Sequence, residues 1–412
     1  MGTFRRAPHV AVATAVACLC LGLSRGHAQG LPSEPLVFAS GRAVVSGDAA
    51  LTASCAHPIG GPGCTTDTGF FNYSDYDDSI LRMVRIGLST SVRLSGRLAA
   101  LGEVRMQNAH APRPYGAYLR YRPFARHDVD IQAGRIPSTF GAFARHAYST
   151  DNLVIGYPLA YQYLISLRYD ALPATPDDLI RMRGRGWLSN FPIGETAPEA
   201  GLPLADAFRW DTGVQAHVGT QWIEAAASVT NGSLTRPLVR DDNRGKQVAA
   251  RVVLKPVVGL TVGVSASRAP FITTATATAA GLDPNRFVQR VMGADVEFSR
   301  DHYLLRAETV ASTFDVPTIA PRLHALATMV EGRYRLTPRL HVAARADHLG
   351  FNRITGATRT ATWEAPVARW ELGTGYAVQR NLQVRAAFQH NWRDGGRVRR
   401  MTALATQLLY WF

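Results

Sequence analysis

Three arginines stand at alternate positions in the run LIRMRGRGW, residues 179–187: Arg181, Arg183 and Arg185. In an extended chain, side chains two residues apart point to the same side, so this spacing predicts a row of guanidinium groups. Guanidinium groups bind carboxylates and phosphates through paired hydrogen bonds, so the row predicts contact with anions. The alternative is that these arginines only brace their own segment, by pairing with Asp177, Asp178 and Glu195.

No catalytic motif accompanies the arginines. The histidines, among them His146, His217 and His341, are scattered along the chain. The sequence contains no HExxH, GxSxG or Gly-rich phosphate loop in a matching context. It therefore predicts a protein that is not an enzyme and that has no cofactor and no metal site. A hydrolase remains the alternative, because a serine, a histidine and a carboxylate or amide could still converge in space.

The first 28 residues have the features of a secretory signal peptide. A basic start at Arg5 and Arg6 precedes an apolar run over 10–23, and small residues follow at Gly26 and Ala28. The apolar run is too short to favour a membrane-spanning helix. We therefore expect an exported mature chain, residues 29–412.

Two cysteines remain in that mature chain, Cys55 and Cys64, and they flank the turn-rich segment AHPIGGPG. In an oxidising compartment this spacing predicts a small loop disulfide. The formal net charge is +14. Export, and the spread of basic residues along the chain rather than in one patch, argue against nucleic acid as a partner.

A period-two pattern predicts all-β structure along the mature chain. In the second candidate strand, for example, Val84, Ile86 and Leu88 share one face, opposite Arg85 and Ser89. A missed or invented hairpin would change the predicted count of sixteen to fourteen or eighteen. The sixteen strands are predicted at residues 35–46, 80–94, 97–109, 115–124, 129–137, 208–219, 220–233, 246–257, 259–270, 286–300, 302–315, 322–338, 339–352, 367–380, 381–393 and 403–412.

Short and long connections alternate between these strands. Turns such as Ser95–Gly96 alternate with polar segments such as 47–79 and 138–207. Bacterial barrels have this arrangement, with short periplasmic turns and longer external loops, whereas a soluble β-sandwich does not require it. The pattern predicts a closed antiparallel transmembrane β-barrel.

Charged residues in the candidate strands fall opposite the apolar face. A charge on the lipid face costs about 2–4 kcal/mol at the midplane, so these residues should face the lumen. Because basic residues are in excess, a modest preference for anions is expected. The predicted lumen-wall residues include Arg85, Arg93, Arg105, Arg120, Arg209, Asp211, Arg251, Arg306, Arg333, Arg345 and Arg385.

The chain ends on an alternating strand, 403–412, whose last residue is the aromatic Phe412. Such an ending is similar to the C-terminal signature that the barrel assembly machinery reads in Gram-negative outer-membrane barrels; the alternative is an edge strand of a soluble β protein. The stretch AGRIPSTFGAF, Ala133–Phe143, resembles the segment that leads into the folded-in third loop of larger porins, including the phosphate-selective type. The mature chain thus resembles a Gram-negative outer-membrane porin of 16–18 strands. With Lys246 and Lys255 as its two lysines, it departs from the phosphate-selective pattern.

This resemblance implies an outer-membrane channel for passive diffusion of small hydrophilic solutes, surrounded by lipid and lipopolysaccharide, with a homotrimer as one open assembly. The remaining alternatives are a barrel hydrolase of the lipase or protease type and a plugged barrel that acts as a scaffold or adhesin. In porins the third loop enters the barrel and narrows the pore, so segment 138–207 is the expected constriction loop. The residues expected to line it are Arg135, Arg145, Asp151, Tyr157, Tyr161, Arg168, Asp177, Asp178, Arg181, Arg183 and Arg185.

Overall fold

The computed structural model describes residues 32–58, 71, 84–108, 111–146, 148–207, 210–242 and 245–412. The chain divides into Met1–Ser33 and one compact unit, Glu34–Phe412. The whole of the predicted signal peptide, residues 1–28, therefore lies outside the described residues. No helix in the described ranges is both long and apolar enough to cross a membrane.

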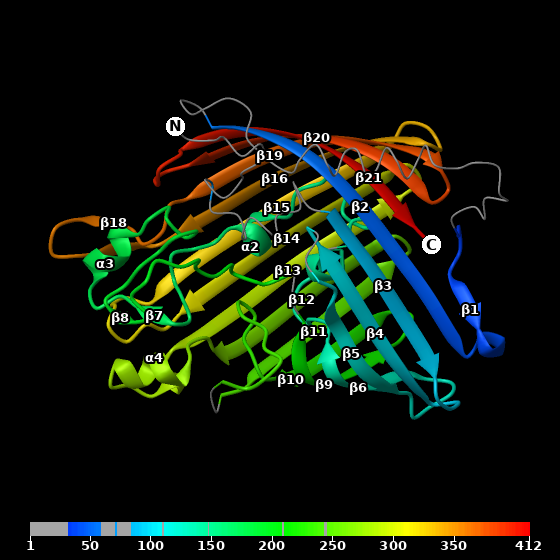
Figure 1. The fold of residues 1–412 in the computed structure, drawn as a ribbon, viewed down its shortest axis with the longest axis horizontal. Coiled ribbons are helices and arrows are strands. Elements are labelled where there is room, and N and C mark those ends of the chain that lie inside the picture. The colour runs from blue at the N-terminus through cyan, green and yellow to red at the C-terminus, as the bar shows by residue number, and fades with distance from the viewer. Residues whose placement is uncertain are drawn as a thin grey trace, which may run out of the picture. The chain divides into compact units, whose positions relative to one another are not determined.

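The compact unit is a closed antiparallel barrel (Figure 1). Its main sheet has 17 strands, of which β1 (Leu36–Phe38) pairs with the start of β2 and does not join the ring. The last strand pairs with β2 and closes the barrel. The predicted sixteen-strand fold is confirmed, and the barrel strands are β2 (Ala43–Pro58), β3 (Val84–Arg93), β4 (Leu98–Gln107), β5 (Arg113–Tyr121), β6 (Asp128–Ile136), β9 (Asp211–Gly219), β10 (Ile223–Thr230), β11 (Gln247–Val257), β12 (Leu260–Pro270), β13 (Val288–Arg300), β14 (Tyr303–Phe314), β15 (Leu323–Arg335), β16 (Leu340–Phe351), β19 (Val367–Gln379), β20 (Leu382–Arg393) and β21 (Arg400–Trp411).

The position of the first strand corrects the sequence-based expectation. A strand at 35–46 and a loop from 47 were predicted, but the first barrel strand is β2, Ala43–Pro58. The segment after Gly47 is rich in alanine and other small residues, so its period-two pattern is weak. Its pairing is nevertheless continuous with the last strand, from Asp48 opposite Trp411 to Pro58 opposite Met401.

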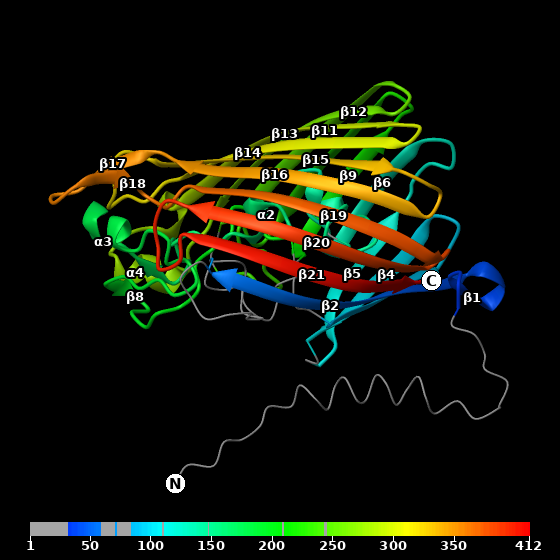
Figure 2. The ribbon, with the colours of Figure 1, turned by 90° about the horizontal axis from the view of Figure 1, so that it is seen from above.

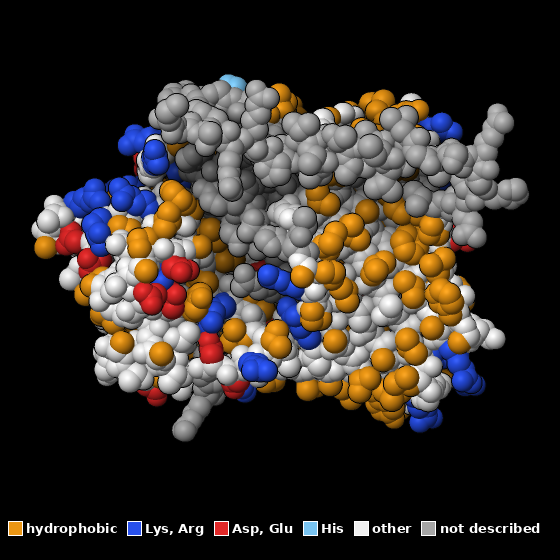
Figure 3. Space-filling view, viewed as in Figure 1, with side chains coloured by type: hydrophobic (Ala, Val, Ile, Leu, Met, Phe, Trp, Pro, Cys, Tyr) orange, Lys and Arg blue, Asp and Glu red, His pale blue; other side chains and the backbone are white. Residues whose placement is uncertain are grey.

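The barrel wall has an apolar outer face and a polar inner face. Large apolar side chains such as Val214, Leu305 and Val330 are exposed on the outside. In Figure 3 hydrophobic side chains spread over the outer wall of the strands. Charged side chains of the barrel strands, such as Arg251 and Glu331, are buried on the inside. The alternation therefore sorts charge into the lumen, as the cost of charge against lipid requires.

The two ends of the barrel differ. Connections of a few residues, such as the tight turn at 94–97, gather at one end, which we call the short-turn end. Phe412 lies there, because its N–H and carbonyl pair with Gly47 at 2.9 and 3.1 Å. Longer connections with β17 (Arg353–Thr355), β18 (Thr360–Thr362) and α4 (Thr274–Ala279) form the opposite, long-loop end, as Figures 1 and 2 show.

The longest connection, residues 137–210, is the third loop of the long-loop end, and we call it the inner loop. Four short elements within it are η4 (Phe143–His146), α2 (Leu159–Gln162), β7 (Ala171–Leu172) and β8 (Ile193–Gly194). A fifth, α3 (Pro176–Arg181), lies near β17 and β18. All residues of α2 are buried, and the helix packs against β15 and β16 from inside the ring (Figure 2). The predicted folding of the third loop into the lumen is confirmed.

Candidate functional site

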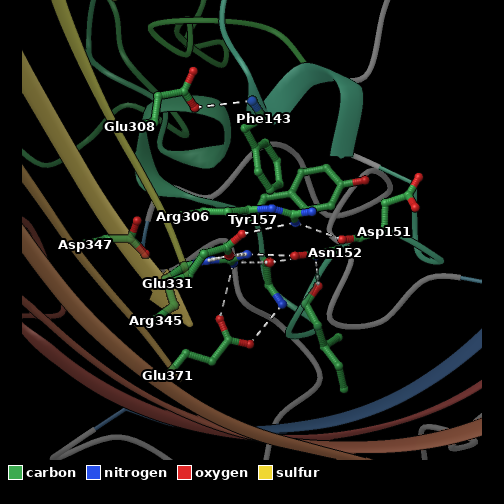
Figure 4. Close-up of polar contacts among 12 residues, drawn as sticks. Phe143, Asp151, Asn152, Tyr157, Arg306, Glu308, Glu331, Arg345, Asp347 and Glu371 are labelled. Atoms are coloured by element: carbon green, nitrogen blue, oxygen red, sulfur yellow. Dashed lines mark hydrogen bonds and ion pairs between the residues drawn. The ribbon is translucent and has the colours of Figure 1, made fainter. Parts of the chain in front are cut away.

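The inner loop enters the barrel directly after β6, where the Thr139 hydroxyl donates to Gln215 at 2.8 Å, and Glu308 of β14 then holds residues 142 and 143. The Glu308 carboxylate accepts hydrogen bonds from the N–H groups of Ala142 and Phe143, at 2.8 and 3.4 Å. The Tyr161 hydroxyl donates a third bond at 2.9 Å. Figure 4 shows Glu308 directed at Phe143. A buried acid that receives several donors fixes the first turn of the loop.

Wall arginines then hold the next stretch of the loop by its carbonyl groups. Arg385 of β20 donates to the carbonyls of Ser149 and Asn152, at 2.6 and 2.9 Å. Arg345 of β16 donates to the Asn152 side chain at 2.7 Å and forms an ion pair with Glu331 at 2.6 Å (Figure 4). The Arg345 and Glu331 side chains are both fully buried, so the pair lies inside packed protein.

Residues 156 and 157 are held in the same way by residues of β19 and β3. The Gly156 N–H donates to Glu371 of β19 at 2.9 Å, and Arg369 donates to the Tyr157 carbonyl. Arg85 of β3 donates to the Tyr157 hydroxyl at 2.6 Å. The predicted wall residues Arg85, Arg345 and Arg385 thus point inward as parity requires, but their guanidinium groups bind the inner loop.

Three residues expected to line a constriction are instead buried within the loop. Tyr157 and Tyr161 are 0% and 2% exposed, and the Phe143 ring packs edge-to-face against Tyr157 and at a tilt against Tyr161. Arg168 is also fully buried, where it pairs with Asp170 at 2.8 Å and donates to the carbonyls of Ser189 and Ala197. The expectation is corrected for these side chains, because a fully packed group cannot face a passage.

Asp151 differs from these three residues, because it is exposed. Its backbone carbonyl accepts a hydrogen bond from Arg306 at 3.1 Å. Partial burial raises the pKa of the Asp151 carboxyl, while Arg306 and Arg385 act in the opposite direction. Nearby, burial raises the pKa of the Tyr148 hydroxyl, which donates to Glu103 at 2.7 Å. Tyr148 therefore stays protonated and holds the acid of β4.

The extended row of arginines predicted at 179–187 is wrong in its conformation. Helix α3 begins at Pro176 because Thr175 and Asp178 form a capping box and proline follows the cap, and the helix ends at Arg181. This is the sequence pattern of a helix start. Gly184 then adopts a φ of +69°, which turns the chain. Asp178 is occupied by the cap, with Arg181 4.0 Å away, and the Asp177 carboxylate accepts bonds from Thr358 and Ala357.

The three arginines nevertheless meet others at the long-loop end, around a cavity of about 740 Å³ that we call the arginine pocket. Three chain segments contribute its six arginines, and Figure 3 shows basic side chains gathered at this end of the molecule. Arg183 pairs with Asp394 at 3.2 Å, and Arg359 donates to the Ile180 carbonyl at 3.1 Å. For the other members within the described ranges, no side-chain acceptor lies within hydrogen-bonding distance. These members are Arg181, Arg185, Arg397 and Arg399.

A second basic group lies at the short-turn end, and we call it the rim arginines. Five arginines, in or directly next to the ends of β2, β3, β4 and β5, surround a cavity of about 170 Å³. The backbone brings them together, since Arg93 bonds to Arg42 and Arg122 bonds to Arg97 through main-chain groups. Within the structure described, their side chains have no carboxylate partner. The members are Arg42, Arg93, Arg97, Arg120 and Arg122.

Between the two basic groups, the wall from β10 to β15 carries both signs of charge. Arg251 and Asp295 form a two-point pair at 2.6 and 2.8 Å, and Arg306 pairs with Glu297 at 2.6 Å. Lys255 pairs with Glu224, and all three pairs line one cavity of about 180 Å³. This part of the lumen is close to neutral, so the uncompensated positive charge lies toward the two ends.

The remaining predicted residues are distributed along the wall. Arg105 pairs with Glu103 and lies 3.6 Å from the centre of the Tyr115 ring. Arg333 is half-buried, and Arg135 donates to the Trp210 carbonyl at 3.2 Å. Asp211 accepts bonds from the N–H groups of Gly232 and Leu238 at the long-loop end.

The structure does not describe several of the predicted residues. The side chain of Arg145, all of Arg209 and Cys64 lie outside the described residues. Cys55 is disulfide-bonded, and its pairing with Cys64 stays a prediction.

The sequence analysis missed Arg359, Arg397 and Arg399 of the arginine pocket. The run RDGGRVRR, residues 393–400, carried a signal, because it concentrates arginines in one connection. No periodicity, however, relates that connection to residues 181–185, which are about 200 positions earlier. The structure brings the two together where Gly184 and Gly396 approach, too closely for a side chain at Gly184.

Comparisons with known proteins place the fold. No protein-family model matches the chain, and no curated protein matches it in sequence. Among solved structures, the anion-selective porin from Comamonas acidovorans matches with a TM-score of 0.55 at 8% identity, over 90% of this chain and 99% of that one. OmpF of Salmonella typhi, in complex with daunomycin, matches with 0.54 at 12%, over 90% and 97%. The outer-membrane channel DcaP of Acinetobacter baumannii matches with 0.52 at 10%, over 91% and 99%. The chain therefore has the fold of outer-membrane porins.

Proposed function

We propose that this protein is an outer-membrane channel for passive diffusion of small hydrophilic solutes, with a modest preference for anions. The observation that carries the proposal is a closed barrel with uncompensated arginines at both ends of its lumen. The porin fold supports a channel, and one structure with this fold is described as anion-selective.

The anion preference is supported by where the positive charge lies. In the middle of the wall, arginines are matched by acids, whereas Arg185, Arg397 and Arg399 at one end and the rim arginines at the other are not. Fixed positive charge at a mouth raises the local concentration of anions and lowers that of cations. Screening limits this effect to about 8–10 Å at physiological ionic strength, so the preference should be modest.

The setting follows from the same proposal. Residues 1–28 would direct export and be removed, which leaves 29–412 to enter the outer membrane, among lipid and lipopolysaccharide. The strand that ends at Phe412 would be recognised by the barrel assembly machinery. A homotrimer is the proposed assembly, supported by a solved outer membrane protein of Vibrio cholerae with a TM-score of 0.52, which is described as a trimer form.

Planar-bilayer recording of the detergent-purified mature chain tests the channel proposal. A channel gives ohmic conductance steps, and a tenfold KCl gradient should give a zero-current potential with the sign of anion preference. A silent membrane after confirmed insertion would instead support a plugged scaffold or adhesin. Release of fatty acid or peptide from a labelled substrate would support a barrel hydrolase. Native electrophoresis in detergent decides between monomer and trimer.

A further inference from the structure

Three potential metal ligands meet on the inner wall near the short-turn end. Asp128 and Asp130 lie two residues apart on β6, so their side chains point to the same face. His217 of β9 is the direct cross-strand partner of Asp130. One ligand atom from each residue lies within 4.8 Å of the others. Strand geometry alone therefore brings two carboxylates and an imidazole together.

The distances within this group suit a shared ion better than a hydrogen bond. His217 Nδ1 is 3.6 Å from Asp130 Oδ2, which is too long for a hydrogen bond. Two ligands about 2.0–2.2 Å from a tetrahedral zinc ion lie about 3.3–3.6 Å apart. Asp128 is exposed, so its carboxylate has room to move the remaining distance.

Several other charged wall residues have a charged partner of opposite sign, whereas the one hydrogen bond to these three groups among the described residues runs from Gln132 to Asp130 Oδ1. His217 Nδ1 is buried and has no hydrogen-bond partner. Asp295 and Asp347 are matched by Arg251 and Arg369 at 2.6 and 2.7 Å. No arginine or lysine of the described chain, by contrast, pairs with Asp128 or Asp130. A buried nitrogen without a hydrogen-bond partner, beside two carboxylates that have no Lys or Arg partner among the described residues, is a ligand set without its cation.

Neighbouring residues position the ligands. The Gln132 side chain donates to Asp130 Oδ1 at 2.8 Å, which leaves Oδ2 directed at His217. Such a bond to the far oxygen orients a ligating carboxylate. Position 219 is glycine, and a Cβ there would lie 2.7 Å from the Asp128 carboxylate. The close approach of Asp128 to β9 thus depends on this glycine.

We propose that Asp128, Asp130 and His217 bind a divalent transition-metal ion of the zinc type. Two carboxylates and one neutral imidazole supply three ligands and a charge of −2, which matches the charge of the ion. The nearest rim arginine on β5, Arg120, lies opposite Gln132 rather than opposite a ligand. Three protein ligands leave a fourth position open toward the lumen. That position takes water or the carboxylate of an anionic solute.

Calorimetric titration of ZnCl₂ into the EDTA-treated mature chain in detergent, purified without a polyhistidine tag, tests the proposal. We expect saturable binding of about one ion per chain, at least tenfold weaker in His217→Ala and Asp130→Asn. Gln132→Ala, which removes only the orienting bond, should weaken binding about tenfold.

The matched control is His341→Ala, an inward-facing histidine of β16 that lies outside the group; it should bind as the wild type does. Heat-modifiable migration verifies folding, and Asp128→Asn, whose side chain is exposed, replaces any variant that fails to fold. Absence of saturable binding by the wild type, or wild-type affinity in His217→Ala, would overturn the proposal.

Discussion

The same residue type serves two regions of this barrel in opposite ways. At the inner end of the third loop, Arg345 and Arg385 are buried and bind carbonyl and carboxylate oxygens. In the arginine pocket, Arg185 is exposed, and no side-chain acceptor among the described residues is close to it. An arginine whose donors are all used positions the chain, whereas one facing water keeps its field available to solutes. Residue type is common to both groups of arginines. Burial and hydrogen-bond partners therefore decide whether an arginine holds the chain or acts on solutes.

Removing a buried arginine should give the largest effect. In Arg345→Ala, Glu331 loses its closer ion-pair partner and keeps Arg306 at 3.5 Å, while the loop loses its bond to Asn152. The expected cost is about 3 kcal/mol, the lower end of the range for a broken buried ion pair. We expect the barrel to assemble but the inner loop to detach from the inner wall. The single-channel conductance should then rise, and the loop should become sensitive to protease. Single-channel recording and limited proteolysis measure this. If neither changes, the wall arginines do not hold the loop.

Neutralising the exposed arginines should have a smaller effect and leave the fold intact. In the triple variant Arg185→Gln, Arg397→Gln and Arg399→Gln, we expect conductance at 0.1 M KCl to fall roughly twofold and that at 1 M to stay nearly constant, because salt screens exposed charge. The control is Arg268→Gln with Arg300→Gln, two exposed arginines on the outward face. An equal loss of low-salt conductance in both variants would show that the arginine pocket has no special effect on permeation.

The rim arginines should have a weaker effect still. Arg93 is exposed at the open short-turn end, where salt reaches it freely. In Arg93→Gln with Arg120→Gln, we expect a conductance loss at low salt that is smaller than that of the pocket variant and absent at about 1 M, where the Debye length is about 3 Å. A loss larger than that of the pocket variant would reverse the ranking of the two ends.

The smallest effect concerns Asp177, which joins α3 to the β17–β18 hairpin. Its bond from the Thr358 hydroxyl, with the N–H of Ala357, lowers the pKa of its carboxyl. A lowered pKa in the folded state means that the stabilisation is present above the unfolded pKa, near 4, and is lost as pH falls through the folded value. Gating events in bilayer recordings should therefore increase below about pH 4 in the wild type and be insensitive to pH in Asp177→Asn. Equal pH dependence in both would exclude this carboxylate.

The sequence predicted the barrel better than it predicted the site. Alternation located fifteen of the sixteen strands, since lipid on one face and water on the other impose a period of two on residues such as Val84 and Arg85. It failed for β2, where alanine and glycine blur the two faces. Parity also predicted that Arg345 points inward. It did not predict that the Arg345 guanidinium would donate its hydrogen bonds to the inner loop. Partners such as Arg183 and Asp394 are about 200 residues apart, and that proximity is a property of the folded loops.

The zero-current potential in a tenfold KCl gradient tests most directly whether exposed arginines, and not buried ones, set the selectivity. The wild type should show anion preference, the glutamine triple variant of the arginine pocket should approach zero, and the outward-facing control should match the wild type. A cation-selective wild type, or a pocket variant with an unchanged potential, would contradict the account.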